Sequence, residues 1–180
     1  RLQQFTGGCI QADGGSRPEL VSRGKMDALE DILEDYVMAT GKKLVIFARF
    51  RPELDVIEKL LKKKKVGYGM IYGDIKLDAR GDIVKDFQTN PATKVFLAQI
   101  DTAGLGITLT AADTCVYYSV NFNYAAYSQS LARIHRIGQR NRCTYIHLVV
   151  EKTVDEQILK ALARKEDLAK TVVDEWRQFF

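Results

Sequence analysis

The chain has 180 residues, of which 46% are hydrophobic, so it is long enough to bury the core of one domain. Its formal net charge of +4 is compatible with binding to nucleic acid but does not by itself establish it. The three cysteines contain no C-x-x-C pair and support neither a zinc ribbon nor a disulfide framework. No apolar run approaches the roughly 18 residues of a membrane span, so we expect no membrane partner.

The chain begins at Arg1 rather than at a methionine, and we expect it to be part of a longer protein. Its first 23 residues are polar and rich in glycine, which predicts a linker or an N-terminal extension. The pattern changes from Lys25 onward. Apolar residues then recur at helical spacing, which predicts a helix that Gly41 can end: Met26, Leu29, Ile32, Leu33, Tyr36 and Val37.

Short apolar runs alternate with helical patterns along the rest of the chain. Strands are expected over residues 43–47, 68–72, 94–98, 115–120 and 144–150. Between them lie helical patterns near 54–61 and 83–87, a glycine-containing turn into a short helical segment over 102–109, and a helix over 124–136. Apolar residues spaced from Val154 to Trp176 predict a long C-terminal helix. We therefore divide the chain into an extension (1–23), a lobe (24–152) and a C-terminal helix packed on the lobe (153–180).

This alternation predicts an α/β fold in which a mostly parallel sheet carries helices on both faces. In such sheets, ligands bind outside the carboxyl ends of the strands. The segments after the expected strands, together with the helix before the last strand, are expected to lie near that rim.

The stretch Gln129 to Gln139, Q-S-L-A-R-I-H-R-I-G-Q, is rich in arginine and contains no acidic residue. Arg133 and Arg136 are three residues apart near the expected end of a helix, so their side chains share a face, and Gln129 shares it too. Planar guanidinium groups suit phosphate oxygens. From the spacing alone, a solvated basic helix end favoured by the helix dipole explains the arginines equally well.

The pattern Q-x-x-x-R-x-H-R-x-G-Q resembles the last helicase motif of the SWI/SNF-type ATPases, a branch of the superfamily 2 helicases. Other segments resemble the same family in the same order: K-L-V-I-F-A-R-F from Lys43, Y-G-D-I-K-L-D-A-R from Tyr72, G-L-G-I-T-L-T-A-A-D from Gly104, and T-Y-I-H-L-V-V-E-K-T-V-D-E from Thr144. The resemblance covers residues 25–173 and implies the second RecA-like lobe of a DNA-dependent ATPase.

The sequence also departs from the family pattern. Gln99-Ile100-Asp101 stands where a serine-threonine-arginine run is usual, Ala103 replaces a glycine, and Thr108 replaces an asparagine. These changes put a hydroxyl contact with DNA phosphate in doubt and exchange a basic residue for an acidic one. Gln99 resembles shorter bacterial and phage relatives, so a bacterial or phage-infected cytoplasm is the expected location rather than a eukaryotic nucleus.

The resemblance implies roles for ten residues. Arg133 and Arg136 would be arginine fingers that act on the transferred phosphoryl group. Gln129, Gly104, Gly106 and Thr108 would face the nucleotide. Arg49, Gly73, Arg80 and Thr102 would follow the DNA backbone without reading bases. The ordinary alternative for Arg80 is an exposed surface arginine.

Other chemistry has little support in the sequence. The two histidines, His135 and His147, have no partner at ligand spacing, so no metal site is expected. The phosphate-loop pattern G-x-x-x-x-G-K-[ST] is absent, and no acidic Asp-Glu box follows a strand. We therefore expect ATP and Mg²⁺ to be held mainly by a first RecA-like lobe of the same polypeptide, double-stranded DNA to be the other partner, and this chain alone to be inactive.

Two other functions stay open at this point. One is the lobe of an RNA helicase of the same superfamily, against which the H-R-I-G-Q ending and the T-V-D-E segment argue. The other is a non-catalytic module that binds nucleic acid or docks to a protein. Such a module has no need to retain both Arg133 and Arg136.

Overall fold

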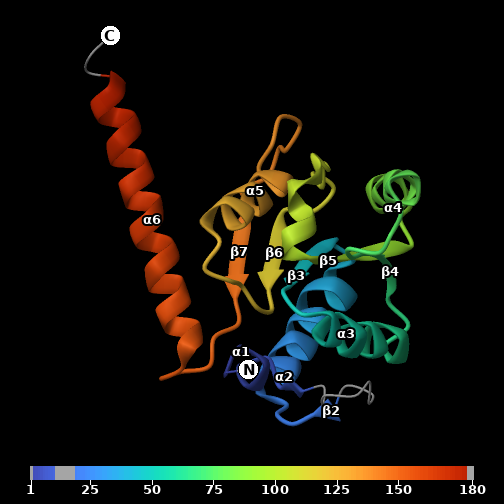
Figure 1. Ribbon diagram of the computed structural model, residues 1–180. Coiled ribbons are helices and arrows are strands. Elements are labelled where there is room, and N and C mark those ends of the chain that lie inside the picture. Colours follow the sequence, from blue (N-terminus) through green and yellow to red (C-terminus); the bar gives the residue numbers. More distant parts are fainter. Residues whose placement is uncertain (1, 11–18, 178–180) are drawn as a thin grey trace.

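A parallel β-sheet forms the centre of the molecule in a computed structural model that describes residues 2–10 and 19–177. Within this part of the chain the sheet has five strands. Their order is β4 (Gly67–Ile71), β5 (Thr93–Gln99), β3 (Leu44–Ala48), β6 (Thr114–Tyr117) and β7 (Thr144–His147), and every neighbouring pair is parallel. The predicted mostly parallel sheet is confirmed, as Figure 1 shows.

Both faces of the sheet are buried, and β3 shows this most clearly. Leu44 and Ile46 belong to one apolar cluster, whereas Val45 and Phe47 belong to the other, and all four side chains are fully buried. This alternation follows from the strand geometry, in which successive side chains point to opposite faces. A continuous apolar run is therefore what a central parallel strand requires.

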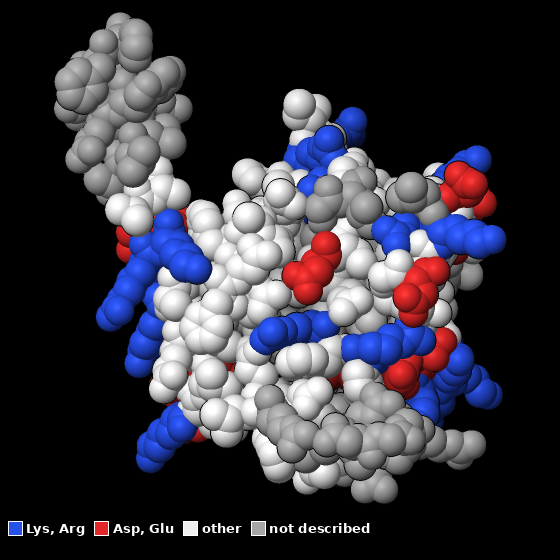
Figure 2. Space-filling model, in the orientation of Figure 1, with Lys and Arg blue, Asp and Glu red and all other residues white. Residues whose placement is uncertain are grey.

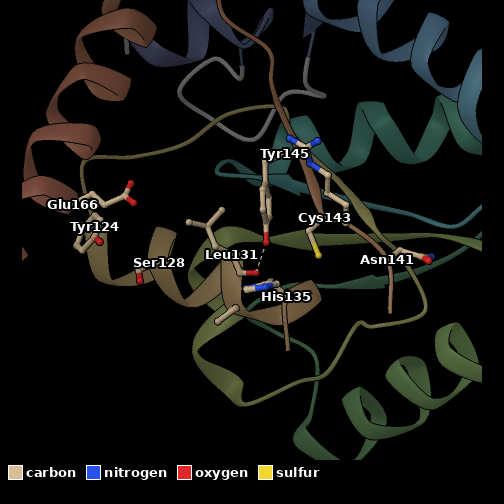
Figure 3. Close-up of a pocket in the computed structure, with 10 residues that line it drawn as sticks. Tyr124, Ser128, Leu131, His135, Asn141, Cys143, Tyr145 and Glu166 are labelled. Carbon is tan, nitrogen blue, oxygen red and sulfur yellow. Dashed lines mark hydrogen bonds between the residues drawn. The ribbon is translucent and has the colours of Figure 1, made fainter. Parts of the chain in front are cut away.

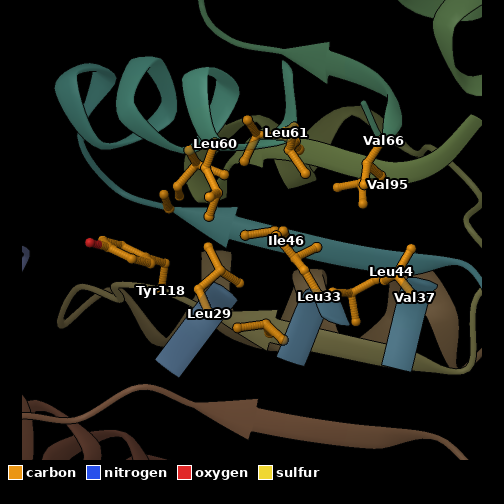
Figure 4. Packing of buried hydrophobic residues seen from close by; sticks show 14 of the residues in the cluster. Leu29, Leu33, Val37, Leu44, Ile46, Leu60, Leu61, Val66, Val95 and Tyr118 are labelled. Atoms are coloured by element: carbon orange, nitrogen blue, oxygen red, sulfur yellow. The ribbon is translucent and has the colours of Figure 1, made fainter. Parts of the chain in front are cut away.

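Helices cover each face of the sheet, so the architecture has the three expected layers of a RecA-like α/β fold. On one face pack α2 (Gly24–Ile32), its π-helical continuation η1 (Leu33–Met38) and α3 (Arg51–Lys63), and Figure 4 shows their apolar side chains meeting those of the sheet. On the other face lie α4 (Leu77–Thr89), α5 (Tyr124–Ile134) and the first turns of α6 (Val154–Arg177).

Local sequence signals explain where two of these helices begin. Asn123 caps α5, because its side-chain oxygen accepts a hydrogen bond from the backbone N–H of Ala126 at 3.2 Å. In α3, Pro52 lies in the first turn, where its missing N–H costs nothing, and the Glu53 carboxylate accepts from the backbone N–H of Phe50 at 3.1 Å.

The residues before α2 contain elements that the sequence did not indicate. They are α1 (Leu2–Thr6) and the antiparallel pair β1 (Cys9–Ile10) and β2 (Glu19–Leu20). The Gln3 side-chain amide donates to the carbonyl oxygen of Val120 at 2.8 Å, and the Tyr118 hydroxyl donates to that of Gly7 at 2.9 Å. Tertiary contacts hold α1, which is too short to show a helical period. Part of the expected extension, residues 1 and 11–18, lies outside the described residues.

The first part of helix α6 packs on the lobe. Ile158 and Leu162 are buried, whereas Leu168 is exposed, and in Figure 1 the helix continues away from the sheet. No helix in the described residues is long and apolar enough to cross a membrane.

Candidate functional site

The two arginines of the central motif lie at the end of α5, near the amino ends of β6 and β7. Helix α5 leaves the carboxyl end of β6 and returns to the start of β7, so it runs opposite to the strands. Gln139 donates to the carbonyl oxygen of Ala112 at 2.8 Å, just before β6 begins. The expectation that this motif lies at the carboxyl rim is therefore wrong, because the last turn of a crossover helix lies at the opposite edge from its first.

Arg136 is exposed and contacts a loop that carries two of the expected nucleotide residues. Its Nη1 atom donates to the carbonyl oxygen of Gly106 at 3.2 Å, to that of Ile107 at 3.4 Å and to Oγ1 of Thr108 at 3.1 Å. The structure thus brings Arg136, Gly106 and Thr108 together. Gly106 has a φ of 70°, and an added Cβ would meet nothing within 4 Å. Glycine is favoured at position 106 because the backbone is left-handed there, and not because a side chain would lack space.

Arg133 lies beside Arg136 but is 91% buried, since only 9% of the residue is exposed. Its Nη1 atom is 3.5 Å from the carbonyl oxygen of Ile107, and its Nε atom is buried without a hydrogen-bond partner. Burial lowers the pKa of Arg133, and the neighbouring charge of Arg136 lowers it further. Within the described residues neither arginine is paired with a carboxylate. Buried donors are nearly always hydrogen-bonded, so the unpaired Nε of Arg133 is unusual.

Gln139, to which the sequence assigned no role, holds the loop after α5. Its side-chain amide donates to the carbonyl oxygens of Thr110 at 3.3 Å, Ala112 at 2.8 Å and Ile134 at 3.3 Å. The only signal for this role was its position as the last residue of the motif. Gln129, by contrast, is exposed one turn before Arg133, and the hydrogen bonds of the two arginines do not include it.

A groove of about 520 Å³ lies on the outer side of α5, and Figure 3 shows the side chains that line it. Its walls come from α5, the start of β7, the preceding loop and one residue of α6: Tyr124, Ser128, Leu131, Ala132, His135, Asn141, Arg142, Cys143, Tyr145 and Glu166. The Tyr145 hydroxyl donates to the carbonyl oxygen of Leu131 at 2.8 Å across it. Neither Arg133 nor Arg136 lines this groove, so it is separate from the arginine site.

Arg49 and Thr102, two of the expected DNA-contacting residues, meet at the carboxyl rim through Gln99. The Gln99 amide donates to the carbonyl oxygen of Arg49 at 3.0 Å, and the Thr102 hydroxyl donates to that of Gln99 at 2.6 Å. The Arg49 guanidinium lies 4.8 Å from the centre of the Phe50 ring. Thr102 is buried, so its hydroxyl serves the local turn in this structure.

Gly73 and Arg80 form a second pair at the same rim, after β4. Arg80 donates from Nε to the carbonyl oxygen of Ile75 at 2.6 Å, and from Nη2 to those of Gly73 at 2.8 Å and Tyr72 at 3.4 Å. Its guanidinium therefore fixes the turn that follows β4, which is more than an ordinary exposed arginine does. Gly104 lies in η2 (Ile100–Leu105), a 3₁₀ segment between this rim and the arginine loop.

Arg51 also belongs to this rim, although the sequence reasoning missed it. Its guanidinium lies 3.4 Å from the centre of the Tyr72 ring, and its Nε is 3.0 Å from Asp55 Oδ1. Its Nη1 is buried without a hydrogen-bond partner. The sequence shows Asp55 one helical turn after Arg51. It does not show the contact with Tyr72, because that contact joins segments about twenty residues apart.

A buried polar network lies behind Arg49. Glu53 is fully buried and accepts hydrogen bonds from the Ser119 hydroxyl and the Phe50 backbone. Burial raises the pKa of this carboxyl group. Its Oε1 atom has no hydrogen-bond partner, and a Cβ added to Gly7 would lie 2.0 Å from it, so α1 closes over this carboxyl group only because residue 7 is glycine.

An ion pair next to this network joins α2 to the start of α6. Lys25 Nζ lies 2.6 Å from Asp155 Oδ2 and also donates to the carbonyl oxygen of Tyr118 at 3.1 Å. The Thr6 hydroxyl donates to the other Asp155 oxygen at 2.8 Å. Asp155 thereby fixes α1, α2 and the start of α6 to one another.

Charge is distributed unevenly over the face shown in Figure 2. Basic side chains project around the loop after α5 and along α6, and acidic side chains also show along α6 and elsewhere on this face. The described residues contain no group of three His, Cys, Asp or Glu side chains that could hold a metal ion.

Comparison with known proteins places this chain in a family. The model of the helicase conserved C-terminal domain matches residues 24–138. The chromatin-remodeling ATPase INO80 is 33% identical over 157 residues in Pyricularia oryzae and 34% identical over 150 residues in Emericella nidulans. These matches cover 87% and 83% of this chain but only 8% and 9% of the relatives, so the chain spans about a tenth of their length.

A crystal structure of the C-terminal part of the Fun30 ATPase domain has the same fold, with a TM-score of 0.73 and 24% sequence identity. The match covers 77% of this chain and 45% of that one.

The expected bacterial or phage-infected cytoplasm is wrong, because the relatives at this level of identity are chromatin-remodeling ATPases of fungi, which are eukaryotes. The error came from reading a lineage from Gln99, a single position. The arginines of the motif, the Gly106 loop and strands β3 to β6 lie within the matched region, and β7 follows it. The chain belongs to the helicase conserved C-terminal domain family and is homologous to the C-terminal lobe of SNF2-family ATPases.

Proposed function

We propose that this chain is the second motor lobe of an ATP-dependent translocase on double-stranded DNA. The observation that carries the proposal is the arginine site. Arg133 and Arg136 lie side by side without a carboxylate partner in the described residues, and the buried Nε of Arg133 lacks an acceptor. An arrangement of this kind is stable when an anion completes it. The relatives are named ATPases, which supports ATP as the source of that anion.

The residues of the site fit a phosphate group but not a metal ion. Guanidinium donors and the open backbone at Gly106 suit phosphate oxygens. No carboxylate joins them in the described residues, whereas Mg²⁺ prefers oxygen ligands such as carboxylates. ATP and Mg²⁺ would therefore be held mainly by the first RecA-like lobe of the same polypeptide, and this lobe would approach the phosphates from the other side.

The two arginines would differ in their tasks. Arg136 is exposed and holds its present acceptors at 3.1–3.4 Å, so it can exchange them for phosphoryl oxygens when the lobes close. Arg133 is buried and would place its planar guanidinium group beside Arg136. Arginine fingers contribute on the order of 10³–10⁵ in rate, because they act on charge that develops in the transition state. Gln129, Gly104 and Thr108 are proposed to face the nucleotide, as the resemblance implies.

The carboxyl rim is the proposed DNA track. Arg49, Arg51 and Arg80 follow the ends of strands β3 and β4, which lie on either side of β5, with Gly73 and Thr102 beside them. Contacts from such groups go to phosphates and fix register without reading bases. The fixed backbone of this rim, clamped by Gln99 and Ser119, supports a track of constant shape.

The experiment that tests this function measures ATP hydrolysis by the full-length polypeptide with no nucleic acid, double-stranded DNA, single-stranded DNA and duplex RNA. We expect the strongest stimulation by double-stranded DNA. Preference for RNA would favour the RNA helicase alternative, and no hydrolysis in any condition would favour a docking module. The 180-residue chain alone serves as a control and should hydrolyse ATP no faster than background.

A further inference from the structure

We propose that Ile137, at the tip of the loop after α5, is a docking residue that enters an apolar site on the nucleotide-binding lobe when the two lobes close. This inference rests on the proposed function. It adds a contact between the lobes to the chemistry assigned to the arginines. The partner surface is apolar and lies close to the bound phosphates.

The exposure of Ile137 is the first observation. The residue is 100% exposed, more than any other large hydrophobic side chain among the described residues. Its neighbours in the loop are basic, including Arg136, Arg140 and Arg142, so no local apolar cluster shields it. Single exposed apolar residues are common on surfaces. Ile137 differs from them because a fixed backbone holds it outward.

The backbone around Ile137 forms a tight turn. The N–H of Gln139 donates to the carbonyl oxygen of Arg136 at 2.9 Å, and Gly138 has a φ of 102°. These features describe a β-turn of the kind that requires a positive φ at its third residue, which glycine supplies. Ile137 is the second residue of this turn. Proline is the residue favoured at this position, because its ring presets φ. The isoleucine side chain has no such effect on the turn, so the turn itself does not explain why Ile137 is there.

The turn is held rigidly at its base. The Gln139 side-chain amide donates to three backbone carbonyl oxygens, and its Oε1 accepts from the N–H of Asn141 at 3.0 Å. The Asn141 amide donates in turn to Asp113 at 3.1 Å. A side chain presented by a fixed turn loses little freedom when it binds, which is how preorganised contacts gain affinity.

The position of the turn identifies its partner. Consecutive Cα atoms are about 3.8 Å apart, so an arginine that reaches a phosphoryl group on the other lobe brings Ile137 against that lobe. The alternative partner is DNA, into which apolar side chains can wedge. The structure argues against it, because the turn follows α5 at the amino ends of the strands, whereas Arg49, Gly73 and Arg80 lie at the carboxyl ends.

The first test uses Ile137→Ser in the full-length polypeptide. Loss of one buried aliphatic contact should lower DNA-stimulated ATP turnover at least about tenfold. Affinity for duplex DNA and its salt dependence should stay unchanged. Ile137→Val should restore most of the turnover. The matched control is Met38→Ser, which removes an apolar side chain that is 52% exposed in η1. Normal turnover in folded Ile137→Ser overturns the inference.

The second test places a photo-cross-linker on Ile137→Cys and irradiates the full-length polypeptide with duplex DNA and a non-hydrolysable ATP analogue. We expect cross-links to the nucleotide-binding lobe that require the analogue. Cross-links to DNA instead would overturn the inference. Arg136→Ala separates the two levels of the account. If Arg136→Ala lowers turnover and Ile137→Ser does not, only the docking role fails, whereas normal turnover in both variants removes the proposed function as well.

Discussion

Arg133 and Arg136 occupy the same helix end, yet their surroundings give them different sensitivity to substitution. Arg133 is buried with a lowered pKa and an unpaired Nε, whereas Arg136 is exposed. In the full-length polypeptide Arg133→Ala should lower DNA-stimulated turnover strongly, and Arg133→Lys should rescue poorly, because a point charge cannot replace a planar fork. Turnover assays on both variants, with Arg142→Lys as the exposed control in the same loop, measure this. Full activity of Arg133→Lys would show that only charge matters there.

Glu53 gives a prediction about pH. Its pKa is raised by burial above the ordinary value of 4.5, so the folded state keeps a proton that the unfolded state releases. Its contribution to stability is therefore fully present below pH 4.5 and is lost as the pH rises through the raised value. As the pH rises from 4.5 through the raised pKa of Glu53, the unfolding free energy of Glu53→Gln should therefore fall less than that of the unsubstituted chain.

Urea unfolding of the chain at a series of pH values checks this prediction. Glu151→Gln, at an exposed position, is the matched control. An unchanged pH profile in Glu53→Gln would contradict a raised pKa for the buried carboxyl group of Glu53. The charged and titratable groups around Glu53 are Lys25, Cys9 and Tyr118, and their contribution remains in both variants.

Residue identity alone could not reveal what several site residues do. The motif spacing indicated that Arg133 and Arg136 share one face at the end of a helix. It could not indicate that Arg80 donates to three backbone carbonyl oxygens, or that the Thr102 hydroxyl serves its own turn. Those roles depend on where neighbouring carbonyl groups point, and only the folded chain fixes that.

At the scale of the elements, the strands and main helices could be predicted because the sequence repeats match their geometry. Continuous apolar runs gave all five strands of the described sheet, and helical spacing gave α2 to α6. Helix α1 was not predicted, because five residues are too few to show a helical period. The hydrogen bonds that hold it reach Val120 and Asp155, which are far along the chain. The end of α5 was placed at the wrong edge because adjacency in sequence to other motifs was taken for adjacency in space.

Asp155 connects three helices, and its removal should act on all of them. Asp155→Ala would leave Lys25 buried without its partner and release the Thr6 hydroxyl. Breaking one side of a buried ion pair costs about 3–5 kcal/mol, so the unfolding free energy of the chain should fall by about that amount. Lys160→Ala, which removes an exposed pair with Glu156, is the control and should cost about 0.5 kcal/mol or less. Equal losses in urea unfolding would show that the buried pair stabilises nothing beyond a surface contact.

At the scale of the whole molecule, DNA binding by this lobe should be weak, independent of base sequence and sensitive to salt. The net charge is only +4, and the proposed contacts at the rim go to phosphates. Each such contact adds about 0.9 to the slope of log affinity against log salt. Arg49→Ala should reduce that slope by about 1. Lys62→Ala, at the exposed end of α3, should leave it unchanged.

Fluorescence anisotropy with two duplexes of different sequence, over a range of salt concentrations, measures both predictions. Tight binding that favours one duplex and hardly changes with salt would contradict the proposed track. It would point instead to direct contacts with base edges.

The central claim is that this lobe supplies charge to a phosphoryl group held by another lobe, and one measurement tests it most directly. Arg136→Ala in the full-length polypeptide should lower DNA-stimulated ATP turnover by a factor on the order of 10³–10⁵, while binding of ATP and of duplex DNA changes little. The reason is that a finger acts on charge that grows only in the transition state. Near-normal DNA-stimulated turnover in a folded Arg136→Ala protein would contradict the account.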